Sequence, residues 1–357
     1  MCLSILCFLL QVLSICESPC GEVSFENTSS VVQTVAVISS TGSSVSSFTM
    51  AGGATEVKTL QSGKYVFSVW PAKENYSLLV GGCDSSAPDE PALPQSDFLF
   101  SVSPSQKVRF SPGNLQYQAS TGTWRFAEHQ YDYVGDATSG NVSEGGNPCD
   151  NSQMSASYSG WIDLFAWGTS GYNGKQPYMN SENYNDYGDG SNDIAATNYD
   201  WGVYATISNG NGYQWRTLTT QEWEYLFKTR SKSLYGHATV CGVKGIVLLP
   251  DNWQLPDGMT FISSPANYYE RNVYDAGQWL QMEEHGAVFL PAAGMRRTDN
   301  VVLSPDEIGY YWTSSCYGVY GAMNIFFTYF SVNVGNTGWL DSNKTFRFEG
   351  SSVRLVR

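Results

Sequence analysis

A long stretch without charge near the C-terminus constrains this chain more than any other feature. From Gly309 to Leu340 the sequence contains no charged residue, yet it holds ten aromatic ones. Such a stretch suits either strands buried in a sheet or an exposed face that binds through rings. The residues between the rings are mostly Ser, Asn and Gly, which favour short strands joined by turns over a helical bundle.

The composition of the whole chain agrees with a strand-rich globular protein. Of its 357 residues 42% are hydrophobic, which is enough for packed cores and excludes a disordered chain. The net charge of −14 argues against a nucleic-acid partner, because phosphate binding needs clustered Lys and Arg. No apolar run reaches the roughly 18 residues that a membrane-spanning helix needs.

The first 16 residues have the pattern of an export leader. Residues 3–15 form an apolar stretch of signal-peptide length, and Leu13-Ser14-Ile15-Cys16 resembles a lipoprotein cleavage box. We therefore predict export to the cell surface or outer membrane, with Cys16 as a lipid anchor and no other membrane contact. The alternative is a buried N-terminal strand.

Cysteine usage agrees with export. Cys20 and Cys83 bracket a compact segment and are candidates for a disulfide. Cys149, Cys241 and Cys316 remain, and their pairing state stays open. With three His in the chain and none near a Cys at ligand spacing, we predict no zinc-type metal site.

The pattern along the chain predicts two folded parts. Residues 17–83 alternate as strands and predict a small all-β sandwich, and residues 84–97 form a Pro-rich linker. Residues 98–357 combine many short strands with few helices, so we predict one α+β domain. A capping box at Thr219 and Glu222 begins one helix, and a second is expected from Tyr274 to Glu284.

Several sequence blocks in the larger domain resemble one family. The main blocks are Trp215–Thr219, Glu222–Tyr225, Phe289–Arg296, Tyr311–Ser315 and Ser352–Arg357, with Gly160–Phe165, Trp167–Thr169 and Tyr199–Tyr204 beside them. Together they are similar to the formylglycine-generating enzyme and sulfatase-modifying superfamily, and the ending and the last three blocks resemble a group of gut bacterial surface proteins. The resemblance covers about residues 98–357 and implies the C-type lectin fold of the formylglycine-generating type.

The resemblance also bears on chemistry. Enzymes of this superfamily use two cysteines that are close in sequence near the C-terminus, whereas this chain has only Cys316 there. We therefore predict no enzyme and no catalytic residue. The non-enzymatic branch includes ligand-binding proteins that retroelements diversify, in which the C-terminal stretch keeps its scaffold residues and varies the rest.

Residues 312–350 of this chain fit that description. The expected ligand-binding residues are rich in Tyr, Asn and Phe, like antibody paratopes, in which rings supply contact area and amides adapt their hydrogen bonds. We expect Tyr317, Tyr320, Phe326 and Tyr329 to be exposed. The full ligand-binding set is Tyr317, Val319, Tyr320, Asn324, Phe326, Thr328, Tyr329, Asn333, Asn336 and Phe348.

Other residues of the domain are expected to be structural. Strand alternation places Trp312 and Phe327 in the core. Arg347 and Arg354 are expected to hold loop carbonyls, or an acid such as Glu222, inside the fold. The structural set is Trp215, Glu222, Trp223, Trp312, Arg347 and Arg354.

One loop is rich in the oxygen ligands that hard cations prefer. Asp186, Asp189 and Asp193 lie in a Gly-bent segment and are a weak calcium candidate of structural role. The alternative is a solvated loop with Asx turns. No other cofactor is predicted.

These observations predict a surface-displayed protein that binds a protein or glycan ligand outside the cell. Two rival functions stay open. A carbohydrate-binding adhesin would stack Trp and Tyr on sugar faces, and an oxidase of the formylglycine-generating class would depend on Cys316. A self-assembling surface component is a third alternative.

Overall fold

The computed structural model divides the chain into two compact units. One unit comprises Met1–Ser96 with Tyr274–His285, and the other, the head, comprises Asp97–Val273 with Gly286–Arg357. The division between Ser96 and Asp97 falls at the end of the expected linker. The residues whose structure is described are 6–9, 13–18, 22–39, 44–60, 63–70, 74–80, 98–133, 154–263, 268–297, 302–334 and 345–357.

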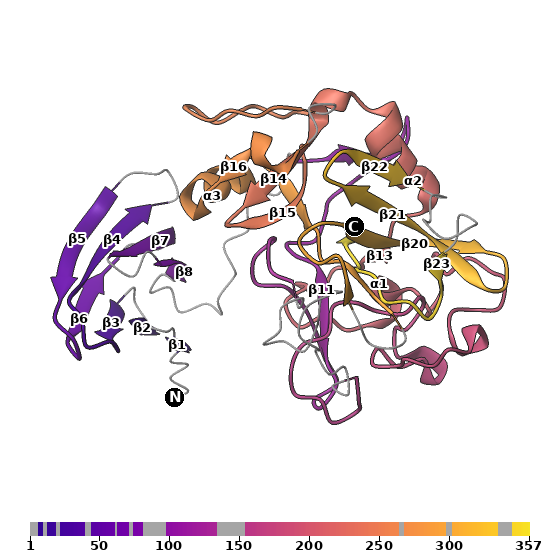
Figure 1. The fold of residues 1–357 in the computed structure, drawn as a ribbon, viewed down its shortest axis with the longest axis horizontal. Helices are drawn as coiled ribbons and strands as arrows, with labels where there is room; N and C mark the ends of the chain where they lie inside the picture. Colours follow the sequence, from indigo (N-terminus) through magenta and orange to yellow (C-terminus); the bar gives the residue numbers. More distant parts are fainter. Residues whose placement is uncertain are drawn as a thin grey trace. The chain divides into compact units, whose positions relative to one another are not determined.

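The N-terminal unit contains two four-stranded antiparallel sheets, drawn in indigo and purple in Figure 1. Their strands alternate between buried and more exposed residues, as in Val35 and Val37, because one face of each sheet packs into a shared core with Phe25 and Phe67. The first sheet has the order β1 (Leu6–Leu9), β2 (Leu13–Ser18), β3 (Glu22–Asn27), β6 (Thr55–Thr59), and the second β5 (Ser44–Met50), β4 (Gln33–Ser39), β7 (Gly63–Trp70), β8 (Glu74–Val80).

The expected leader contributes strands in the full-length chain. Residues 6–9 and 13–18 form β1 and β2, which extend the first sheet beside β3, so Cys16 lies within β2. The apolar segment thus forms strands, as in the alternative to a leader. Export stays a prediction. Cys20, Cys83, Cys149 and residues 84–97 lie outside the described residues.

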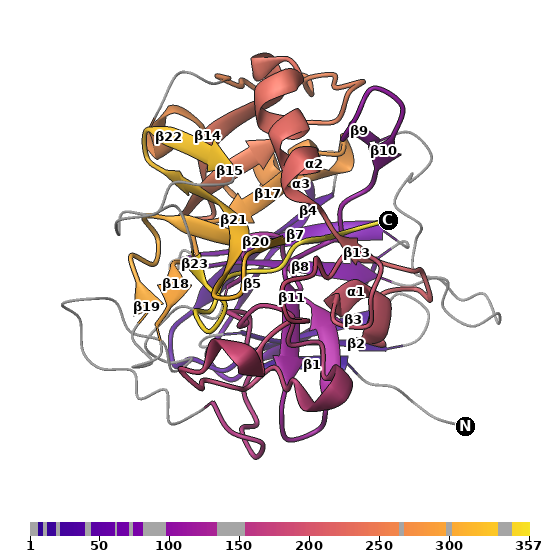
Figure 2. The same cartoon turned by 90° about the vertical axis from the view of Figure 1, so that its right-hand side faces the viewer.

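The head is an α+β domain in which short strands outnumber helices. Two hairpins open it, a four-stranded sheet fills its middle, and a second sheet near the C-terminus is drawn in yellow (Figure 2). The hairpins and small pairs are β9 (Phe100–Ser101) with β10 (Lys107–Val108), β11 (Leu115–Gln118) with β12 (Thr123–Phe126), β13 (Arg216–Thr217) with β24 (Leu355–Val356), and β18 (Met295–Arg296) with β19 (Val302–Leu303). The sheets are β16 (Val273–Tyr274), β14 (Tyr235–Val240), β15 (Val243–Leu248), β17 (Val288–Pro291), and β20 (Gly309–Tyr317), β21 (Gly321–Thr328), β22 (Ser331–Val334) with β23 (Thr345–Phe346) on β21.

Three α-helices occur among the described residues. Thr219 and Glu222 form the expected capping box at the start of α2, and Asp275 and Gln278 form a second one at α3. Both helix predictions are confirmed, although α3 groups with the N-terminal unit. None of the described helices is long and apolar enough to cross a membrane. The helices are α1 (Trp201–Tyr204), α2 (Thr220–Glu224), which continues into a π-helical turn at Tyr225–Thr229, and α3 (Ala276–Glu284).

Tryptophan rings fill the core of the head. One cluster packs Trp223 against Tyr311, Ile325 and Phe327, and a second is built around five Trp residues. Large rings bury much apolar area per residue, and aliphatic side chains such as Leu218, Ile246 and Leu355 pack among them. The five are Trp124, Trp167, Trp201, Trp215 and Trp312.

Candidate ligand-binding face

The C-terminal sheet has two different faces. Along β21, Ile325 and Phe327 lie opposite Tyr311 and Gly309 of β20, and this face packs into the core with Trp223. The other face carries Phe326, which lies between Tyr310 of β20 and Asn333 of β22. The sequence predicts that scaffold residues alternate with binding residues along this strand. The alternation itself is present, because neighbouring residues of a strand point to opposite faces of the sheet.

The second face is closed where we expected it to be open. Phe326 is buried and stacks on Tyr310, with 5.8 Å between ring centroids. Asn324 is buried too, and its Nδ2 donates to Thr345 Oγ1 at 2.6 Å. Thr328 is buried beside the Ser331 hydroxyl. The expectation that Phe326 is exposed is wrong, and Asn324 and Thr328 are likewise withdrawn from direct contact with a ligand.

The exposed rings gather instead at the turn between β20 and β21. Gly318 takes a φ of 62° in this turn, which glycine adopts without strain. Val319 and Tyr320 follow it, both exposed, and the Tyr320 ring meets the edge of Tyr184 at 4.5 Å. Tyr317 at the end of β20 is half-buried.

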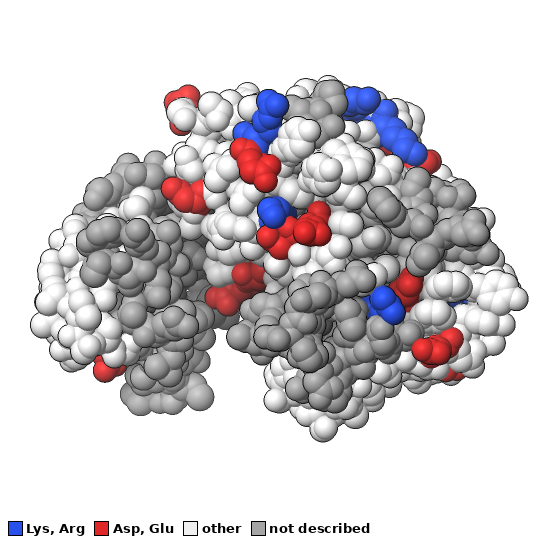
Figure 3. Space-filling model, viewed as in Figure 1, with Lys and Arg blue, Asp and Glu red and all other residues white. Residues whose placement is uncertain are grey.

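β23 adds two more rings to this turn. Phe346 lies opposite Gly321 in the sheet and stacks on Phe348, with centroids 4.9 Å apart and ring planes within 12°. Phe346 is exposed and Phe348 half-buried. We call Tyr184, Val319, Tyr320, Phe346 and Phe348 the hairpin tip. On the face shown in Figure 3, uncharged surface predominates and charged side chains stand in small separate groups.

Tyr329 lies at the other end of β21 from the hairpin tip. Seven residue steps separate Gly321 from Thr328, which is about 23 Å along a strand. Tyr329 is exposed and stands beside Tyr268 and Phe330, while Asn333 is half-buried with its amide on Ser331. The single face expected from sequence is therefore two separate surfaces. Asn336 lies outside the described residues.

Arg347 fixes the hairpin tip through backbone atoms. Its Nη2 donates to the Gly318 carbonyl at 2.8 Å, and its Nε donates to the Gly321 carbonyl at 3.1 Å. The guanidinium also lies over the Trp167 ring, 4.7 Å from its centroid. A rigid fork of donors suits this task, since it holds both ends of one turn at once.

Cys316 lies beside the same guanidinium. Arg347 Nη2 approaches its Sγ at 2.9 Å, and the thiol donates to the Gly318 carbonyl at 3.0 Å. Burial raises the pKa of the Cys316 thiol, and the neighbouring Arg347 only partly opposes this. A raised pKa keeps the group as a thiol, the unreactive form. Cys241 belongs to another sheet, in the turn between β14 and β15.

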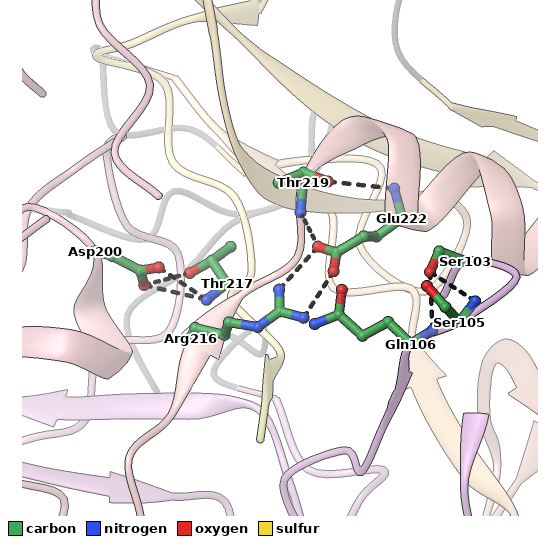
Figure 4. A network of polar contacts seen from close by, with 8 residues as sticks. All are labelled: Ser103, Ser105, Gln106, Asp200, Arg216, Thr217, Thr219 and Glu222. Atoms are coloured by element: carbon green, nitrogen blue, oxygen red, sulfur yellow. Dashed lines mark hydrogen bonds and ion pairs between the residues drawn. The ribbon is translucent and has the colours of Figure 1, made fainter. Parts of the chain in front are cut away.

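The entry to α2 is held by a partly buried ion pair (Figure 4). Arg216 donates to both carboxylate oxygens of Glu222, at 2.8 and 2.7 Å, and Glu222 also accepts from the Thr219 backbone N–H. The partner of Glu222 is thus Arg216, whereas Arg347 holds loop carbonyls, the first of the two roles expected for it. Sequence reasoning considered only Arg347 and Arg354, which are distant in sequence, as partners of Glu222. It therefore missed Arg216, which lies six residues before Glu222.

Two further polar groups complete the scaffold. Arg354 is buried and donates through Nη2 to Gln130 Oε1 at 2.5 Å. Asp200 is buried too, and accepts from the backbone and hydroxyl of Thr217 and from the Gly202 N–H. Burial raises the pKa of Asp200 to about 6, since these bonds only partly offset the loss of hydration.

The carboxylates of the calcium candidate face different partners. Asp186 accepts from Ser181 Oγ at 2.6 Å, and Asp189 accepts from Asn192. Asp193 Oδ1 accepts from the Cys316 backbone N–H at 2.7 Å, which ties this loop to the end of β20. The part of the chain described here contains no group of three metal-ligating side chains. A structural calcium ion stays a prediction.

No family model, curated protein or solved structure matches this chain.

Proposed function

We propose that this chain is a surface-displayed ligand-binding protein whose hairpin tip contacts a protein or glycan outside the cell. One observation carries the proposal: the tip is anchored through backbone atoms while its side chains point outward. Arg347 holds the carbonyls of Gly318 and Gly321, and Asp193 holds the Cys316 N–H. The exposed side chains of Val319 and Tyr320 are therefore not needed to hold the turn together.

The head is proposed to have the C-type lectin fold of the formylglycine-generating type, in its non-enzymatic branch. Two blocks of the resemblance support this, because Trp215–Thr219 contains β13 and Ser352–Arg357 contains β24, which pair with each other. The mixture of many short strands and few helices also agrees.

Binding without catalysis fits the thiol chemistry of the tip. An oxidase would need a reactive thiolate, whereas burial raises the pKa of Cys316. The alternative is tested by replacing Cys316 with Ser and assaying oxidation of a cysteine peptide. If the wild type oxidises the peptide and the variant does not, the binding proposal gives way to the oxidase.

Sequencing this locus across related isolates tests the proposal directly. We expect substitutions at the exposed tip positions Val319, Tyr320 and Phe346. The matched controls are Ile325 and Phe327, which lie on β21, the strand that follows the turn, but face the core. Equal constancy at both sets of positions would contradict a retroelement-diversified tip and favour a receptor with one fixed ligand.

Export and lipid attachment through Cys16 are also part of the proposal. The test is metabolic labelling with an alkyne palmitate in a bacterium that processes lipoproteins. Wild-type protein should carry the label in the membrane fraction, and the Cys16→Ser variant should carry none. A wild-type protein that stays unlabelled in the cytoplasm would refute both parts.

A further inference from the structure

A second group of exposed rings lies at the end of β21 remote from the hairpin tip. Tyr268, Tyr329 and Phe330 are each about half exposed, at 49, 51 and 47%. We call these three the distal aromatic cluster. Single exposed rings are ordinary on protein surfaces, but here Tyr329 contacts both Tyr268 and Phe330, and grouped exposed rings are typical of interaction sites.

Tyr329 contacts both of the other rings. Tyr268 stacks on it, with planes within 26° and centroids 6.0 Å apart. Phe330 stands almost perpendicular to it, at 81° and 4.6 Å, so that Tyr329 and Phe330 meet at a corner. About half of each side chain in this corner is exposed.

Buried polar side chains hold the segments that carry these rings. Asn272 accepts from the Ile262 N–H and donates to the carbonyls of Ile262 and His237, at 2.7 to 2.8 Å. The His237 ring bonds through Nε2 to the Thr328 carbonyl at 2.8 Å, directly before Tyr329. Both side chains are almost fully buried. The rings therefore stand on a preorganised base, which lowers the entropy cost of binding.

The backbone of Tyr268 is held in an unusual conformation. Its φ is 114°, a value that residues with a side chain rarely adopt. The Tyr268 carbonyl accepts from the Arg271 N–H at 3.1 Å, which closes the turn after it. Backbone strain of this kind concentrates at ligand-contacting sites, where the surrounding structure enforces it.

The groups around the corner are hydroxyls and amides. Ser331 Oγ accepts from Asn333 Nδ2 and also bonds to Thr328 Oγ1, which is buried. The polar groups beside the rings that can still meet a ligand are therefore those of the half-buried Ser331 and Asn333. The β21–β22 turn lies in the uncharged stretch, and the charges of Glu270 and Arg271 after Tyr268 cancel.

We propose that Tyr268, Tyr329 and Phe330 bind the apolar face of a neutral saccharide. A pyranose ring has flat C–H faces that pack on aromatic rings and hydroxyls around its rim that bond to neighbouring polar groups. An uncharged corner of preorganised rings beside the Ser331 hydroxyl and the Asn333 amide matches that chemistry. This site does not depend on the hairpin tip, and either site can fail without the other.

Affinity electrophoresis of the full-length protein tests the site. The gels contain a neutral glucan, mannan, galactan or xylan, and retardation gives an apparent affinity. At least one polymer should retard the wild type, and Tyr329→Ala should weaken the retardation at least tenfold. Tyr329→Phe keeps the ring and should lose less than threefold. The matched control is Tyr213→Ala, an equally exposed tyrosine that belongs to neither the distal aromatic cluster nor the hairpin tip, which should not change the retardation.

Three results would overturn the proposal. One is the absence of retardation by all four polymers. Another is an equal loss in Tyr213→Ala and Tyr329→Ala, which would show that the loss is not specific to the distal aromatic cluster. The third is a dimer in size-exclusion chromatography that Tyr329→Ala converts to monomer, because a second copy of the chain would then cover the cluster. Circular dichroism confirms that each variant is folded.

Discussion

Asp200 should make the head less stable as the pH rises. Its carboxyl group is fully buried, and burial raises its pKa from the ordinary value of 3.8 to about 6. A raised folded-state pKa means that the folded protein binds this proton more tightly than the unfolded chain does. The contribution of Asp200 to stability is therefore greatest below pH 3.8 and declines as the pH rises through 6.

The size of the effect follows from the shift. A difference of about 2.2 units corresponds to about 3 kcal/mol between the two ends of the titration. Between pH 4.5 and pH 8 the free energy of unfolding should fall by about 2 kcal/mol from this group alone, because part of the change lies below pH 4.5. Glu349 acts in the same direction, since burial raises its pKa to about 7.

The Asp200→Asn variant isolates the effect. An asparagine cannot ionise, yet its Oδ1 can still accept from the Gly202 N–H and the Thr217 hydroxyl. Its NH2 group replaces the oxygen that accepts from the Thr217 N–H, which lowers stability by an amount that does not depend on pH. Urea unfolding is followed by tryptophan fluorescence, which reports mainly on the head, at several pH values for both proteins. The stability difference between wild type and variant should change by about 2 kcal/mol across this range. A difference that stays constant with pH would show that Asp200 titrates normally and that the reasoning about its burial is wrong.

Three further predictions concern the scaffold and the tip. Phe327→Ala should cost about 3 to 5 kcal/mol in urea unfolding because it empties a core site, whereas exposed Tyr320→Ala should stay within about 0.5 kcal/mol. Arg347→Ala should cost about 2 to 3 kcal/mol, since it leaves the carbonyls of the tip without their charged donor; equal stability of variant and wild type would contradict the anchoring role. Thr219→Ala should lower the thermal midpoint by an amount equivalent to about 1 kcal/mol through loss of the α2 cap, and an unchanged midpoint would speak against that cap.

Local sequence signals predict the scaffold well. The capping box at Thr219 and Glu222 is visible in the sequence because its two partners are three residues apart. The alternation of Ile325 and Phe327 with Phe326 is visible because a strand repeats every two residues. Both signals are local, so a single segment carries all the information that they need.

The surface of the tip could not be predicted in the same way. Tyr184 comes from a loop more than a hundred residues before Tyr320, and no spacing rule links the two. Phe326 is buried because Tyr310 of the neighbouring strand covers it, which strand alternation alone does not reveal. A strand has two faces, and the sequence cannot distinguish a face that is open from one that its neighbours close.

The two ends of β21 are stabilised by different contacts, and this difference predicts which positions should vary among related isolates. At the hairpin tip, Arg347 and Asp193 contact the backbone, so Val319 and Tyr320 can change without loss of the turn. The distal cluster instead depends on particular side chains, because its base requires Asn272 and its corner requires the rings themselves. If the tip is diversified and the distal cluster binds a saccharide, substitutions should occur at Tyr320 while Tyr329 stays aromatic. Equal variation at both positions would mean that the distal rings have no fixed ligand, and constancy at both would remove the case for a diversified tip.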